Sequence, residues 1–227
     1  MADLPIIFSA PMVRALLDGR KTQTRRVIKP QPEVAENGSW RWKLPRGVSA
    51  GSHITSLPDV LARWCTYTPG DRLYVREAWT ARMTHGWTIA HARSRLYQEE
   101  ILYRADGHES IDGWWPSIHM PREFSRLTLT VTNVRVQQLQ DISRHDALAE
   151  GVEMETADPP FYYVPGIWPH SLTAVGIEEP GGRHAERSFA KLWNNLHGPE
   201  AWDANPWVAA YSFTVQRGNI DQIGGAA

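Results

Sequence analysis

Basic and hydroxyl-bearing side chains are concentrated in residues 16–26, which read LLDGRKTQTRR. Lys21 lies among three arginines and is followed by two threonines, Thr22 and Thr24. Nearby cations and burial both lower the pKa of a lysine, and a neutral lysine can take a proton from a hydroxyl so that the oxygen attacks a carbonyl carbon. A cluster of cations can also bind an anion. Residues 16–26 are therefore the first candidate for chemistry, and their cations are Arg20, Lys21, Arg25 and Arg26.

The elements that must position this segment can be predicted from the pattern around it. Residues 5–8 are typical of a short strand, and Ser9 followed by an early proline is typical of the start of a helix, here over residues 10–17. Apolar side chains fall on one stripe of that helix, and Gly19 is a typical residue just after a helix end. A strand over residues 22–28 then follows.

The rest of the chain has the pattern of an α+β protein. Strands and helices do not alternate regularly, which favours a small mixed or antiparallel β-barrel with flanking helices over a doubly wound parallel sheet. We expect one domain over residues 1–227, with two irregular insertions rich in proline and glycine at about 29–66 and 155–183, and a frayed end from residue 218. The further expected elements are strands at 72–79, 100–104, 126–137 and 207–215, and helices at 143–150 and 185–196.

Composition narrows the class of protein. The 227 residues include 24 basic and 25 acidic ones, a formal charge of −1, so any nucleic-acid surface must be local. The single cysteine, Cys65, excludes an internal disulfide framework and a cysteine-based zinc cluster, and it is typical of a reducing compartment. The sequence has no run of about 18 apolar residues that would predict a membrane helix. From the single cysteine and the lack of a membrane helix we expect a cytoplasmic protein. None of the nine histidines forms a ligand pair at helical spacing, so we expect no metal, and we expect no other cofactor.

Two other groups of residues could contribute to a site. Alternation in the strand at 72–79 points Glu77 inward, where the carboxylate needs a partner, and an ion pair with an arginine would supply one. Trp79 could line a pocket or belong to the core. A second basic group follows a pair of tryptophans and could bind a single-stranded or flipped nucleotide, or form a solvated strand edge; it consists of His119, Arg122 and Arg126.

Several short motifs carry a resemblance to a known family. They read LDGRKTQTR at 17–25, PGDRL at 69–73, LQDI at 139–142 and AEGV at 149–152. Together they resemble the ASCH domain, a small barrel of the PUA-like superfamily. The motifs SIHMPR at 117–122 and WDANPW at 202–207 make the chain especially similar to the longer ASCH proteins associated with phages and prophages. The resemblance implies a PUA-like fold and a nucleoside or nucleic-acid ligand, since the family includes bacterial N4-acetylcytidine amidohydrolases.

The resemblance also implies roles for individual residues. In the amidohydrolases a lysine and a threonine of the basic loop act with a glutamate on a later helix, and these positions correspond to Lys21, Thr24 and Glu150. Thr24 would attack an acyl carbonyl on an exocyclic amine, Lys21 would serve as the base, and Glu150 would orient the pair or activate the hydrolytic water. The expected substrate-binding residues are Arg20, Arg25, Arg26, Glu77, Trp79, His119, Arg122 and Arg126.

Other interpretations of the same residues stay open. Arg20 and Lys21 could complement the dipole at a helix end, the threonines could be ordinary strand residues, and Glu150 could be a solvated helix end. The alternative function is a non-catalytic module that binds RNA or DNA by recognising a modified or flipped base, and a third is a ribonuclease. The short amidohydrolases lack the two insertions, so the size of the substrate is open, as are its sugar and its acyl group.

Overall fold

The chain forms two units in the computed structural model. The first unit consists of residues 1–21, 70–130 and 214–227, and the second consists of residues 22–69 and 131–213. The residues that the structure describes are 1–34, 40–42, 64–81, 88–94, 101–108, 111, 113–156, 158, 160–165 and 184–223.

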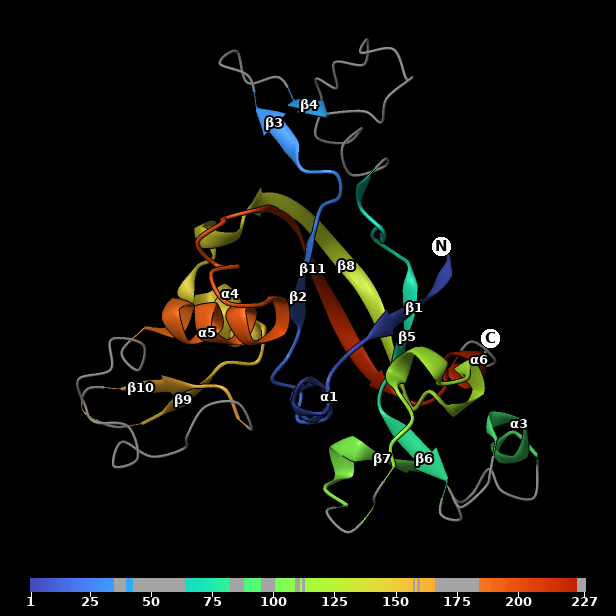
Figure 1. Ribbon diagram of the computed structural model, residues 1–227. Coiled ribbons are helices and arrows are strands. Elements are labelled where there is room, and N and C mark those ends of the chain that lie inside the picture. The colour runs from blue at the N-terminus through green and yellow to red at the C-terminus, as the bar shows by residue number, and fades with distance from the viewer. Residues whose placement is uncertain are drawn as a thin grey trace. The chain divides into compact units, whose positions relative to one another are not determined.

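Five strands are hydrogen-bonded in one sheet in the order β1-β5-β8-β11-β2 (Figure 1). Strand β1 runs parallel to β5, whereas β5 is antiparallel to β8 and β2 is antiparallel to β11. The sheet is therefore mixed, which confirms the α+β class, but its described strands are not closed into a barrel. The bounds are Asp3–Ile7 for β1, Gln23–Val27 for β2, Arg72–Arg76 for β5, Leu127–Gln138 for β8 and Trp207–Arg217 for β11.

Helix α1 of the first unit spans Ala10–Leu17, as its apolar stripe predicts. Gly19 has a φ of 74°, a left-handed conformation that glycine adopts without steric cost, and this confirms its place just after the helix end. The helix packs against the 3₁₀ helix η2, Arg104–Asp106. Its buried residues are Met12, Val13, Ala15 and Leu16.

A small aromatic core in the first unit is built around Trp79. This residue begins strand β6, Trp79–Ala81, which pairs antiparallel with β7, Ile101–Tyr103. Its side chain is fully buried, and its ring centroid lies 4.4 Å from that of Trp115 and 5.1 Å from that of Phe124. Trp79 is thus a core residue. The other short elements of this unit are α3, Ile89–Ala92, η3, Ser117–His119, and η4, Arg122–Phe124.

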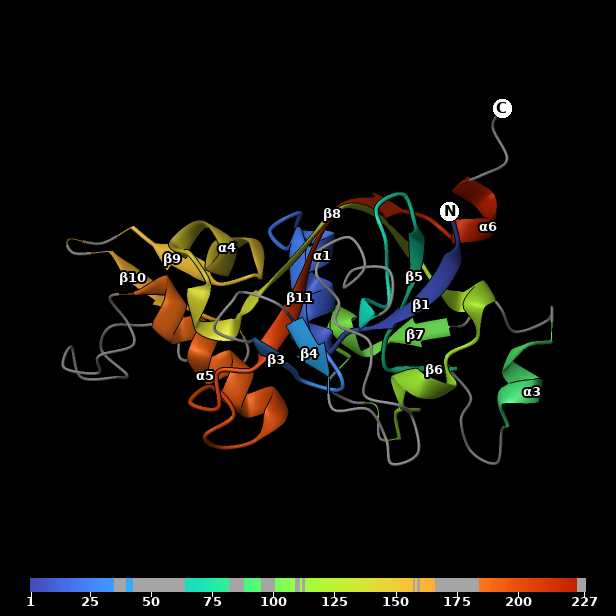
Figure 2. The ribbon, with the colours of Figure 1, turned by 90° about the horizontal axis from the view of Figure 1, so that it is seen from above.

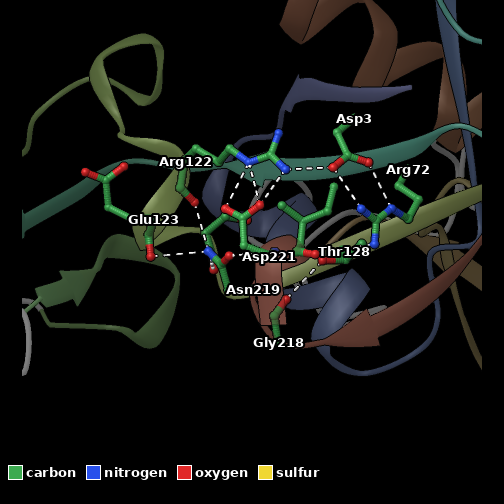
Figure 3. Close-up of polar contacts among 10 residues, drawn as sticks. Asp3, Arg72, Arg122, Glu123, Thr128, Gly218, Asn219 and Asp221 are labelled. Carbon is green, nitrogen blue, oxygen red and sulfur yellow. Dashed lines mark hydrogen bonds and ion pairs between the residues drawn. The ribbon is translucent and has the colours of Figure 1, made fainter. Parts of the chain in front are cut away.

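The end of the described chain is a short helix, α6, Ile220–Ile223. The expectation of a frayed end from residue 218 is therefore wrong for residues up to 223. The helix is held by the side chain of Asn219 (Figure 3). Its Nδ2 donates to three main-chain oxygens in the loop around η4, and its Oδ1 accepts the N–H of Asp221 at 2.9 Å. Those three oxygens belong to Arg122, Glu123 and Ser125, at 2.9, 3.2 and 2.9 Å.

Helices α4 and α5 pack against each other in the second unit, beside the strand pair β9–β10 (Figure 1, Figure 2). Helix α4 spans Arg144–Ala149, and the hydroxyl of its N-cap, Ser143, accepts the N–H of Asp146 at 3.1 Å. Helix α5 spans Ala185–His197 and buries Phe189, Leu192 and Trp193. No helix in the described ranges is long and apolar enough to cross a membrane.

Both segments that we expected to be irregular contain paired strands. In the first, β3, Pro32–Val34, pairs antiparallel with β4, Trp40–Trp42. The second, which begins at about residue 155, contains β10, Phe161–Tyr163, and this strand pairs antiparallel with β9, Glu153–Glu155, at the start of the segment. Most of the rest of these segments, residues 35–39, 43–63 and 166–183, lies outside the described residues. One further 3₁₀ helix, η5, spans Leu139–Asp141.

Candidate functional site

A buried polar cluster of the second unit surrounds Arg25 on strand β2. Gln23 and Arg25 are two residues apart on the strand, so their side chains point to the same face. Asp146 and Glu150 are four residues apart along α4 and its C-cap, so their carboxyl groups also share a face. Strand β2 and helix α4 are in contact, and this brings the two pairs together.

Arg25 donates hydrogen bonds to all three of these neighbours. Its Nη1 lies 2.7 Å from Oε1 of Gln23 and 3.0 Å from Oε1 of Glu150, and its Nη2 lies 2.9 Å from Oδ2 of Asp146. Arg25, Asp146 and Glu150 are only 2%, 5% and 3% exposed. Because water is largely excluded, these charge-assisted bonds are strong and fix the directions of both carboxyl groups.

A second arginine balances the charge of this cluster. Nη2 of Arg135, on β8, donates to both oxygens of Asp146, at 2.9 and 2.8 Å. Burial by itself raises the pKa of Asp146, but the hydrogen bond from Arg135 and the positive charges of Arg25 and Arg135 outweigh burial and lower the pKa below its ordinary value of 3.8. Two guanidinium groups thus face the carboxyl groups of Asp146 and Glu150.

Main-chain hydrogen bonds fix the start of the strand that carries this arginine. The N–H of Thr22 donates to the carbonyl oxygen of Ala149 at 2.9 Å, and the carbonyl of Thr22 accepts the N–H of Phe213 at 2.9 Å. Ala149 directly precedes Glu150 in the chain. The segment after residue 21 is therefore held at the end of α4 by its backbone as well as by Arg25.

Thr24, the predicted nucleophile, is only 2% exposed. It lies between Gln23 and Arg25 on β2, so alternation directs its side chain to the opposite face of the strand. Its hydroxyl has no hydrogen-bond partner among the described residues. Within the second unit, the structure thus brings Arg25, and not Thr24, to Glu150.

Lys21, the predicted base, belongs to the first unit. Its side chain is 1% exposed, and its Nζ lies 5.7 Å from the centroid of the Phe8 ring. Its main-chain N–H donates to the carbonyl oxygen of Ala15 at 3.0 Å, which fixes the residue to α1. Lysine is almost never fully buried unless it is paired.

Buried Glu77 and partly exposed Arg126 form an ion pair in the first unit. Nε and Nη2 of Arg126 donate to the two oxygens of Glu77 at 2.9 and 3.1 Å, and the same guanidinium binds Asp106 at 2.8 and 2.9 Å. The guanidinium carbon also lies 4.0 Å from the ring centroid of Tyr103. Burial raises the pKa of Glu77, and Arg126 only partly offsets this effect. Strand β5 ends at Arg76, one residue before Glu77, but the glutamate is buried and has an arginine partner, as its expected inward position required.

Arg122 is engaged in a second network of the first unit (Figure 3). It binds Asp221 through Nε and Nη2, and its Nη2 also donates to Oδ2 of Asp3 at 2.7 Å. Arg72 donates to both oxygens of Asp3 at 2.8 Å. The hydrogen bond from Arg72, supported by Arg122, lowers the pKa of Asp3. Arg122 and Arg126 thus bind carboxylates of the protein itself, which uses the hydrogen-bonding capacity that we assigned to a substrate.

The remaining predicted binding residues do not join these clusters among the described residues. Arg20 binds the exposed carboxylate of Asp18 at 2.8 Å. Arg26 is half-buried, and its charge helps to lower the pKa of His197, although burial of that imidazole is the larger cause. His119 is exposed on η3.

Sequence reasoning missed the central role of Asp146. Asp146 was not among the predicted site residues; its main-chain N–H binds the N-cap of α4, and its carboxylate reaches Arg25 and Arg135. The four-residue spacing between Asp146 and Glu150 was the available signal, because it places two acids on one helical face. Arg135, in a strand of alternating residues, carried no comparable signal.

Comparisons with protein-family models, with curated proteins and with solved structures find no match to this chain. Within the described residues, no three His, Cys, Asp or Glu side chains gather as the ligands of a metal ion would. What the geometry offers for chemistry is a set of buried polar groups: Lys21 in the first unit, and Thr24, Arg25, Asp146 and Glu150 in the second.

Proposed function

We propose that the protein is an amidohydrolase that removes an acyl group from the exocyclic amine of a modified cytosine nucleoside such as N4-acetylcytidine, free or within nucleic acid. The proposal includes a PUA-like barrel and a location in the cytoplasm. The location is supported by the single cysteine, which is typical of a reducing compartment. Its catalytic residues are Lys21, Thr24 and Glu150.

The observation that carries the proposal is the ion pair between Arg25 and Glu150, with a distance of 3.0 Å. It joins strand β2 to the end of α4, the two parts of the second unit in which the resemblance puts Thr24 and Glu150. The burial of Lys21, Thr24 and Glu150 supports the same function, since groups able to transfer protons are costly to bury and are concentrated at active sites.

The proposed reaction has two steps. In the first, the neutral amine of Lys21 takes the proton of the Thr24 hydroxyl, Oγ1 bonds to the acyl carbon, and the bond from that carbon to N4 breaks. The proton held by Lys21 passes to N4, so that cytidine leaves as a neutral amine. In the second step, Glu150 takes a proton from water and the water oxygen bonds to the acyl carbon. The bond from that carbon to Oγ1 then breaks, and the proton held by Glu150 passes to Oγ1, so that the acid leaves and both the Thr24 hydroxyl and the Glu150 carboxylate are restored. Arg25 is a positioning residue because it acts through Glu150.

The test is incubation of the full chain with N4-acetylcytidine, with chromatographic detection of cytidine and acetate. We expect cleavage by the wild type and a loss of at least about 100-fold for Lys21→Ala and Thr24→Ala, since a positioned proton transfer contributes about 10²–10⁴-fold. Thr22→Ala is the matched control, because it removes an exposed hydroxyl from the same segment. Full activity of Thr24→Ala would remove the nucleophile from the proposal.

The alternative, a module that recognises a modified or flipped base without cutting it, makes a different prediction for the same sample. No cytidine would be released, and an RNA or DNA oligonucleotide carrying N4-acetylcytidine would bind more tightly than its unmodified counterpart. That pair of results would replace the hydrolase by the binding module.

A further inference from the structure

A cavity of the first unit lies beside the start of helix α1 and contains none of the proposed catalytic residues. Its volume of about 410 Å³ is within the range of about 300–1,000 Å³ that is usual for small-molecule sites. Two of its lining residues are arginines and none is acidic. The lining consists of Phe8, Ser9, Ala10, Pro11, Arg14, Ala78, Arg104 and Ser117.

Arg104 supplies the more available of the two positive charges. Its main-chain N–H donates to the carbonyl oxygen of Ala78 at 2.9 Å, which fixes the start of η2 at the cavity. Its guanidinium makes no hydrogen bond or ion pair with any described residue. Two acidic residues lie close in sequence to the lining residues Ala78 and Arg104. They are Glu77 and Asp106, and both are bound to Arg126. The charge of Arg104 is therefore not neutralised by the carboxylates beside it.

Arg14 supplies the second charge from the other wall. Its Nη1 donates to the carbonyl oxygen of Ala105 at 3.2 Å, a neutral acceptor that leaves the positive charge uncompensated. In the described part of the chain no carboxylate forms an ion pair with Arg14. The bond to Ala105 ties helix α1 to η2 and so holds Arg14 and Arg104 on the same cavity.

Neutral donors complete the lining. Ser9 is the N-cap of α1, yet its hydroxyl makes no capping hydrogen bond, and the first turn of the helix has no acidic residue. Ser117 contributes a second hydroxyl. The start of an eight-residue helix adds the positive end of its dipole to the charges of the two arginines.

We propose that this cavity binds the phosphate monoester of a small molecule about the size of a nucleotide. A phosphate monoester carries close to two negative charges near neutral pH and three acceptor oxygens, which matches two guanidinium groups and two hydroxyls better than a single carboxylate does. Arg104 and Arg14 bind the phosphate oxygens, and Phe8 and Pro11 offer apolar surface to the rest of the ligand. The proposal is independent of the hydrolase reaction, because it shares no residue with it.

The experiment is calorimetric titration of the full chain with ribose 5-phosphate, with ribose, and with an oligouridylate of eight nucleotides that lacks terminal phosphates. We expect binding of ribose 5-phosphate, none of ribose, and weakening of the former as sodium chloride is raised. Arg104→Gln should weaken binding at least tenfold. Arg187→Gln is the control, because it removes another exposed arginine, from α5 in the second unit.

Each outcome decides the proposal. Equal affinity for ribose and its phosphate, or an unchanged affinity in Arg104→Gln, would refute it. Tighter binding of the oligouridylate than of ribose 5-phosphate, lost in the same variant, would mean that the cavity binds phosphodiesters of a polymer, and the small-molecule ligand would be wrong. Since the readout is binding and not cleavage, none of these results depends on whether N4-acetylcytidine is a substrate.

Discussion

Replacement of Arg25 by methionine tests whether the buried cluster of the second unit is held together by its charges. The methionine side chain fills much of the same volume but leaves Asp146 and Glu150, 5% and 3% exposed, without the guanidinium that lies 2.9 and 3.0 Å from them. Removal of one partner of a buried ion pair costs about 3–5 kcal/mol. Because Arg135 still binds Asp146, we expect the lower end, about 3 kcal/mol.

Urea unfolding, followed by tryptophan fluorescence and by circular dichroism, measures this loss. With a slope of about 3 kcal/mol per molar urea, the midpoint should fall by about 1 M. Coincidence of the two curves is needed before a free energy is extracted. Arg144→Met, at an exposed position of α4, is the matched control and should change the free energy of unfolding by less than about 0.5 kcal/mol.

A double-mutant cycle separates the charge from the shape of the arginine. If Arg25 and Glu150 interact directly, the loss in Arg25→Met combined with Glu150→Gln should be smaller than the sum of the two single losses. Arg25→Lys should fall between wild type and Arg25→Met, since it keeps the charge without the fork that reaches two carboxylates. A loss below about 1 kcal/mol for Arg25→Met would refute this account of the cluster.

Other predictions concern pH and the core. Folding lowers the pKa values of Asp3 and Asp146, so the stability that they supply is complete at a pH above the ordinary carboxyl pKa of 3.8 and is lost as the pH falls through their pKa values in the folded protein. An unchanged urea midpoint between pH 5 and pH 2.5 would contradict this. Trp79→Ala should cost about 3–5 kcal/mol in urea unfolding and Trp79→Phe less, because the buried indole N–H has no hydrogen-bond partner among the described residues. The pKa of His197, measured by NMR titration, should lie below 6.5 and rise in Arg26→Gln, and no change in that variant would exclude a contribution from Arg26.

Local features of the fold could be predicted because the information lies within a few residues. The apolar stripe and Gly19 define helix α1, and the alternation of β5 buries Leu73 and Val75 as expected. The helix predicted at 143–150 is α4, with Ser143 as its N-cap. These predictions depend on backbone geometry and hydrophobic periodicity, which act at short range.

Long-range pairings could not be predicted in the same way. The carboxylate of Asp146 binds Arg25, 121 residues away in the sequence, and this choice depends on which strand and helix come into contact. Burial alone predicted that Glu77 would need a partner such as an arginine. The sequence did not indicate which of the arginines of the chain would be that partner, and in the structure it is Arg126. The helix after Asn219 was missed because the bonds that hold it come from the loop around η4.

The hydrogen bonds of Asn219 and Arg217 have a consequence for synthesis on the ribosome. Arg217 donates to the carbonyl oxygen of Leu17, 200 residues earlier in the chain, and Asn219 holds the loop that carries Arg122. Strand β1 can pair with β5, and α1 can pack against η2, before these residues are made, but the bonds from Arg217 and Asn219 can form only after the late residues have left the ribosomal exit tunnel. A translation pause just before these residues should therefore prolong the time for which the loop around η4 and the end of α1 lack these bonds, whereas an early pause should not.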